Sequence, residues 1–100
     1  MIHALLDATQ VLGAVTYDGS THDVVAEAVA NHDRRTKVLT VSLRAFLRAG
    51  ASDEFGKVST PPWLPALETV TEHVEIEEAT EMAKDIFASW RRKVSAAIPG

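Results

Sequence analysis

The N-terminal stretch constrains the fold most, because it places an acidic residue directly after a short apolar run. Ile2–Leu6 contains one polar residue, His3, and is followed by Asp7. A run without an alternating polar face is typical of a strand covered on both sides in a parallel sheet. Asp7 with Gln10 three residues later is an arrangement that caps a helix N-terminus. The pattern predicts a strand, a turn carrying an exposed carboxylate, and a helix through Val15.

The same stretch has a second interpretation. Four apolar residues fall on one helical face, namely Leu5, Ala8, Leu12 and Val15, so a continuous helix over residues 2–15 also fits the spacing. We favour the strand followed by a helix, since Asp7 and Gln10 form a capping pair only if a helix starts there. In an α/β domain such a turn is where ligands bind, which makes Asp7 the first candidate functional residue.

Composition indicates one ordinary globular domain. The chain has 100 residues, of which 46% are hydrophobic and 24% charged, values typical of a folded soluble protein. It contains no cysteine, so no disulfide framework or cysteine-based zinc site contributes, and nothing points to an oxidising compartment. No run approaches the ~20 apolar residues of a membrane span. We therefore expect a cytoplasmic protein that does not insert into membranes. The net charge of −4 argues against nonspecific electrostatic binding of nucleic acid as the main function.

The middle of the chain reads as alternating helices and strands. After a turn at Tyr17–Gly19, Ser20 and Asp23 repeat the capping arrangement and predict a helix through residue 29. Lys37–Val41 is a β-branched run that predicts a second strand. The helical spacing within Leu43–Leu47 then predicts a short helix.

The last part of the chain follows a polar segment, residues 51–60, that predicts a loop. Paired prolines suit the first turn of a helix reaching Val70, and Val74–Ile76 predicts a short third strand. Glu77–Ala97 is the clearest predicted helix. Its apolar stripe recurs at helical spacing and consists of Ala79, Met82, Ala83, Ile86, Trp90, Val94 and Ala97.

Together these elements predict an α/β fold in a single domain over residues 1–100. The expected architecture is a small three-stranded, mainly parallel sheet flanked by helices, with Ile2–Leu6, Val38–Val41 and Val74–Ile76 as adjacent strands. The alternative is an all-α bundle.

Three segments carry a family resemblance. Leu5–Leu12, Thr40–Arg48 and Leu67–Ala79 resemble parts of PIN-domain ribonucleases of the toxin–antitoxin type. The resemblance implies a PIN-like fold, Asp7 as a catalytic metal ligand, Mg²⁺ or Mn²⁺ as cofactor, RNA as substrate and an antitoxin as protein partner.

The residues match that family only in part. Mg²⁺ needs several converging oxygen ligands, whereas Ser42–Ala45 stands where the resemblance expects a glutamate. Asp53 and Glu54 are the remaining candidate metal ligands beside Asp7. The resemblance then implies a truncated or degenerate nuclease with an incomplete active site, weak metal binding and little RNA cleavage. Whether the chain is an enzyme stays open.

The second function class is a noncatalytic protein-interaction or dimerisation module, in which Asp7 is only a helix cap. The number of large aromatic residues relative to a small core predicts a homodimer; they are Phe46, Phe55, Trp63 and Trp90. The basic run Arg91–Lys93 beside Trp90 has two interpretations, a nucleic-acid contact or cations near a helix C-terminus.

Overall fold

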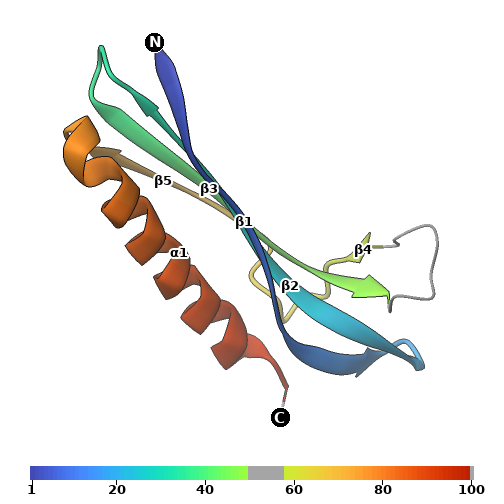
Figure 1. The fold of residues 1–100 in the computed structure, drawn as a ribbon. Coiled ribbons are helices and arrows are strands. Elements are labelled where there is room, and N and C mark those ends of the chain that lie inside the picture. The colour runs from blue at the N-terminus through green and yellow to red at the C-terminus, as the bar shows by residue number, and fades with distance from the viewer. Residues whose placement is uncertain (50–57, 100) are drawn as a thin grey trace.

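The protein is a twisted antiparallel sheet with one helix across one face (Figure 1). The computed structural model describes residues 1–49 and 58–99. Its elements are β1 (Ile2–Tyr17), β2 (Ser20–Asp33), β3 (Val38–Ala49), β4 (Val58–Ser59), β5 (Leu67–His73) and α1 (Ile76–Ala97). The first three strands are neighbours in the order β1-β2-β3, and the far edge of β3 pairs with β5 over one part of its length and with β4 over another.

The predicted α/β fold is wrong, as is the all-α alternative, because every strand pairing in the described residues is antiparallel. The segments expected as neighbours, Ile2–Leu6 and Val38–Val41, are separated by β2. Val74–Ile76 forms no strand. The helices expected over residues 7–15, 20–29 and 43–47 are strand, and none forms over 61–70. Of the expected loop over 51–60, residues 51–57 lie outside the described residues.

Two β-bulges explain the helical spacing in β1. The register with β2 shifts between Ala4 and Leu6 and again between Val11 and Gly13. Each bulge adds one residue to a strand that otherwise alternates with period two. Four of the partly buried apolar residues therefore recur at intervals of three and four instead of two, namely Leu5, Ala8, Leu12 and Val15; Leu6 and Tyr17 are partly buried beside them. Asp7 lies inside this strand and caps no helix.

Strands β1 and β2 are joined by a tight hairpin turn. Asp18 and Gly19 both have positive φ, 50° and 78°, as a type I′ turn requires at its two central residues. The turn predicted at Tyr17–Gly19 is confirmed. It connects two strands and not two helices.

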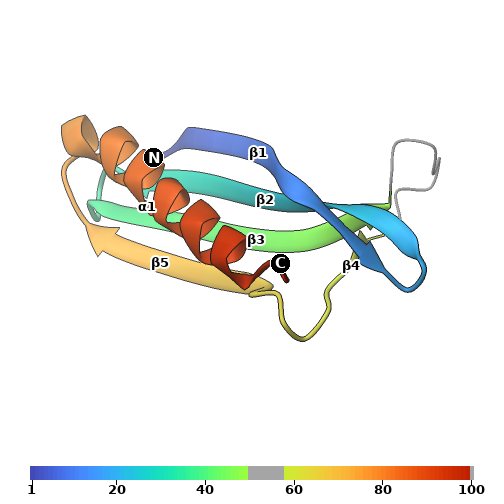
Figure 2. The ribbon, with the colours of Figure 1, turned by 90° about the horizontal axis from the view of Figure 1, so that it is seen from below.

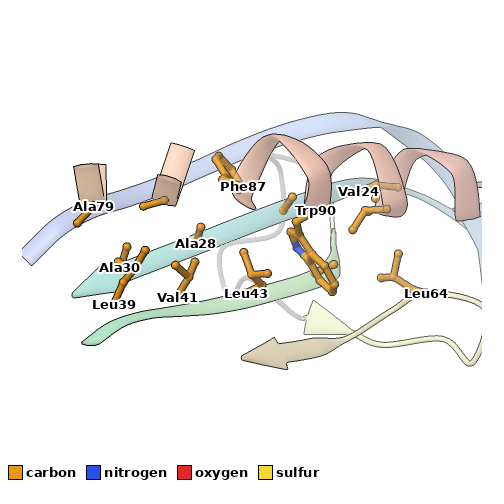
Figure 3. Close-up of a cluster of buried hydrophobic side chains, with 14 of the residues drawn as sticks. Val24, Ala28, Ala30, Leu39, Val41, Leu43, Leu64, Ala79, Phe87 and Trp90 are labelled. Atoms are coloured by element: carbon orange, nitrogen blue, oxygen red, sulfur yellow. The ribbon is translucent and has the colours of Figure 1, made fainter. Parts of the chain in front are cut away.

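The core lies between α1 and one face of the sheet (Figure 2). Small residues of β2 face the helix, namely Ala26, Ala28 and Ala30, and small helix residues, Ala79 and Ala83, belong to the same cluster. Figure 3 shows Trp90 reaching from the helix toward Leu43 of β3, whereas Phe87 lies on the side of the helix nearer β1; both belong to the core cluster. The predicted helix over 77–97 is confirmed, and Met82, Ile86 and Trp90 pack on the sheet as expected.

Two polar contacts fix the start of the helix. His32 is buried, and its Nε2 donates to the Val74 carbonyl oxygen at 2.6 Å. The Val74 amide in turn donates to the carbonyl oxygen of Lys37 at 2.8 Å. These contacts hold the residues before α1 against the β2–β3 connection, so the helix begins at one end of the sheet.

Further contacts secure the C-terminal half of the helix on both of its sides. The Trp90 indole donates to the Arg44 carbonyl oxygen of β3 at 3.0 Å. Lys93 forms a 3.0 Å ion pair with Glu68 of β5, and Arg91 donates to Gln10 of β1 at 2.5 Å. The helix is therefore held centrally over the sheet, with β1 along one side and β5 along the other.

The close helix–sheet approach predicts the effect of enlarging a small core residue. Ala83→Leu adds three carbons in the packed core and should lower the free energy of unfolding by about 1–3 kcal/mol. Ala96 is exposed on the same helix, so Ala96→Leu should change it by less than about 0.5 kcal/mol. Urea denaturation of both variants measures the difference. Equal losses would contradict this packing.

Candidate functional site

The structure does not bring the predicted metal ligands together. Asp7 is exposed in the middle of β1, directly opposite Val29 of β2. Asp53 and Glu54 lie outside the described residues. Within the described residues, no three or more histidine, cysteine, aspartate or glutamate side chains are arranged to hold a metal ion. Asp7 is thus a carboxylate on a strand that belongs to no group of three or more such ligands within the described residues.

The surface with most distinctive chemistry is the sheet face opposite α1, which we call the open face. Residues directly opposite each other on paired strands share a face, and the register assigns one residue per strand to each row. One row across this face consists of Asp7, Val29, Ser42 and Thr69, and the next consists of Thr9, Glu27, Arg44 and Leu67. Hydroxyl, aliphatic and charged side chains therefore alternate along the strands of the open face.

Large aliphatic side chains are exposed on the open face. The register places five of them there, with exposed fractions from 40% to 79%: Ile2, Val11, Val29, Val58 and Leu67. Single exposed aliphatic residues are common on protein surfaces, but their collection on one face is typical of an interaction surface.

Two charge pairs on the open face join β2 and β3. Glu27 lies opposite Arg44 with 3.7 Å between carboxylate oxygen and guanidinium nitrogen, and Asp23 lies opposite Arg48 at 3.5 Å. In both pairs the acid is on β2 and the base is on β3. The Arg44 guanidinium also lies 4.6 Å from the ring centroid of Phe46, a cation–π contact that helps to orient it. The face therefore presents two parallel acid–base pairs and little net charge between them.

The histidines have structural positions. His3 lies directly opposite His32 in the register of β1 and β2. Because a carbonyl oxygen only accepts, the bond to Val74 places the His32 proton on Nε2. The Nδ1 atom of His22 donates to the Ser20 carbonyl oxygen at 3.0 Å, and its ring meets Tyr17 edge-on. The bonds of His22 and His32 thus fix the start of β2 and the start of the helix.

A surface ion pair also fixes the approach to the helix. Lys37 Nζ lies 2.7 Å from a Glu75 carboxylate oxygen. The hydrogen bond from Lys37 holds the pKa of the Glu75 carboxyl below its ordinary value, and the same bond raises the pKa of the Lys37 ammonium. Both groups therefore stay ionised through neutral pH.

Trp90 is not available to stack on a nucleic-acid base. Its side chain is 2% exposed and hydrogen-bonded to β3. Lys93 is paired with Glu68. These positions do not favour the basic run as a nucleic-acid contact, because Trp90 cannot stack on a base and Lys93 already has an acidic partner.

Comparison with known proteins does not assign the chain to a family. No family model, curated protein or solved structure matches the chain. The resemblance to PIN-domain toxin ribonucleases is wrong, because its segments do not form a parallel sheet. Leu5–Leu12 lies in β1 and Thr40–Arg48 in β3, while Leu67–Ala79 covers β5 and the start of α1; all of these strands are antiparallel. No helix in residues 1–49 and 58–99 has the length and apolar character needed to cross a membrane.

The position of Asp7 predicts a small effect of removing its charge. Asp7→Asn keeps the shape of an exposed strand residue and should change the free energy of unfolding by less than about 0.5 kcal/mol, because no helix cap is lost. Thermal or urea denaturation measures this directly. A loss above about 1 kcal/mol, the typical cost of removing an N-cap, would show that Asp7 has a structural partner.

Proposed function

We propose that this chain is a noncatalytic dimerisation module whose open face packs against the open face of a second copy. The observation that carries the proposal is the combination on one face of exposed aliphatic side chains with two acid–base pairs of the same orientation. A cytoplasmic location, expected from the cysteine-free composition, accompanies this proposal.

The size of the open face suits a dimer interface. Where β5 pairs with β3, the face is four strands wide over seven residues and covers roughly 440 Å² in projection, from ~4.8 Å per strand and ~3.3 Å per residue; β1, β2 and β3 extend it further. Side-chain relief makes the accessible area larger, close to the ~800 Å² per partner of a standard interface. Two such faces would stack ~10 Å apart as in a β-sandwich. The exposed aliphatic side chains would then leave water.

The charge pattern favours a second copy of this chain as the partner. Consider a two-fold axis that runs along the strands between β2 and β3. It would place Glu27 of one copy above Arg44 of the other, and Asp23 above Arg48, because each acid is on β2 and each base on β3. Every charge on these two rows would then meet an opposite charge on both copies. The face is thus complementary to itself, as an isologous interface requires.

A strongly charged partner fits the open face less well. The acids and bases of its central rows already neutralise one another, so neither nucleic acid nor a highly acidic protein would gain a large electrostatic attraction there. Rows of valine, threonine and serine instead suit a second β-sheet face.

Charge reversal with mixing tests the proposal. In R44E, positions 27 and 44 are both acidic, so this row would repel the same row of a facing copy. In E27R, both positions are basic, and the rows would again repel. Each variant should dimerise at least tenfold more weakly than the wild type. An equimolar mixture should recover dimers, because each E27R chain then faces an R44E chain. Sedimentation equilibrium measures all three samples. Lys84→Glu on α1 is the control, since Lys84 lies on the helix side and should leave dimerisation unchanged.

Three outcomes would contradict the proposal. The wild type could be monomeric at high micromolar concentration, the single variants could dimerise like the wild type, or their mixture could fail to recover dimers. Circular dichroism and urea denaturation of each variant establish that it is folded before its association is compared.

A further inference from the structure

On the helix side of the sheet, a groove runs between α1 and β1. It has a volume of about 420 Å³ and is lined by Gln10, Leu12, Ala88, Arg91, Arg92 and Ser95. We infer that this groove is a binding site for an oxyanion, a carboxylate or phosphate group carried on a small apolar body. The site is independent of the proposed dimer interface, which lies on the opposite face of the sheet.

The two arginines of the groove differ from most basic residues of this acidic chain. No acidic side chain in the described residues lies within ion-pair distance of Arg91 or Arg92. By contrast, five of the seven other lysines and arginines in the described residues have an acidic partner, namely Lys37, Arg44, Arg48, Lys84 and Lys93; Arg34 and Arg35, on the β2–β3 connection, form no such pair. Two arginines thus line one groove, and the described residues place no acidic side chain beside them.

Arg91 is held in position before any ligand arrives. Its Nη1 donates to the Gln10 side-chain oxygen at 2.5 Å, and its guanidinium lies 4.8 Å from the ring centroid of Phe87. A guanidinium has five N–H donors in a fixed planar fork. The bond to Gln10 uses one of them, which leaves donors for an oxyanion at little cost in side-chain entropy.

Helix electrostatics do not account for these arginines. Cations near a helix C-terminus offset the helix dipole, but this effect falls off within the last turn. The helix ends at Ala97, and its last turn contains no basic residue. Arg91 and Arg92 lie further back, where the carbonyl groups are hydrogen-bonded within the helix.

The remaining lining residues define the ligand class. Ser95 is one turn beyond Arg91 on the helix and adds a hydroxyl donor, while Leu12 and Ala88 provide apolar surface. Guanidinium groups bind carboxylate and phosphate oxygens through paired charge-assisted hydrogen bonds. An anion with a compact apolar body therefore matches both parts of the groove, and an inorganic ion would use only the polar part.

An NMR titration with benzoate, phenyl phosphate and inorganic phosphate tests the inference. At constant ionic strength, both organic anions should give saturable shifts at Gln10, Arg91 and Ser95, and inorganic phosphate should bind more weakly. Arg91→Gln should weaken binding about tenfold through loss of the paired bonds. Arg91→Lys, which keeps the charge without the fork, should fall between. Lys84→Gln is the matched control on the same helix and should bind like the wild type.

The tighter of the two organic anions identifies phosphate or carboxylate as the preferred group. Shifts that stay linear with concentration for both organic anions would overturn the inference, and so would equal affinities of R91Q and K84Q. Amide signals of β2 and β3, remote from the groove, report whether each variant keeps its fold.

Discussion

The structure depends on the close contact between one helix and one face of the sheet. That contact is possible because β2 presents alanine to the helix at three alternate positions and the helix presents alanine in return. With little side-chain bulk between the backbones, Trp90 reaches β3, and Phe87 fills the core on the side nearer β1 (Figure 3). Interiors are packed closely enough that these small and large residues must fit together. The alanines therefore fix both where the helix lies and which side chains complete the core.

One helix covers one face, and this leaves most of the other face of a long sheet to other uses, although Val25 and Phe46 on that face are already buried. The strands of that face use threonine, serine and valine, which suit a pleated surface, and charged pairs that neutralise one another. A domain of about 100 residues buries only a modest core. Burial of a second face against another copy would add to that core. Dimerisation would thus complete the packing of a two-layer fold, and the groove beside the helix remains accessible to a ligand.

The sequence predicted the helix well and the sheet poorly, for definite physical reasons. The helical stripe of residues 77–97 was long and regular, although Phe87 was not assigned to it. In β1, two bulges converted an alternating pattern into one with helical spacing. In β2, the alanines that allow close packing of α1 also have high helix propensity. Valines lie on both faces of β2, so its sequence shows no clear alternation of polar and apolar residues. The Asp18–Gly19 pair is the local sequence signal for a hairpin, and it indicates strands instead of helices on both sides of the turn.

The candidate surfaces could not have been found without the register. Glu27 and Arg44 are far apart in the sequence, and only strand pairing makes them neighbours on one face. Gln10 and Arg91 are separated further, and only the position of the helix brings them together. The prediction from sequence placed chemistry at Asp7 because it assumed that a strand ended there. In the structure β1 continues through Asp7, so Asp7 lies within the sheet and not in a turn at its edge.

The central claim is that a second copy covers the open face, and solvent relaxation of methyl signals tests it most directly. Val29 is 40% exposed on the open face of a single copy, and Ala96 is exposed on the helix. A soluble paramagnetic agent should relax the Val29 methyl groups less as protein concentration rises, while Ala96 stays equally accessible. Equal relaxation of Val29 at all concentrations, in parallel with Ala96, would contradict the account.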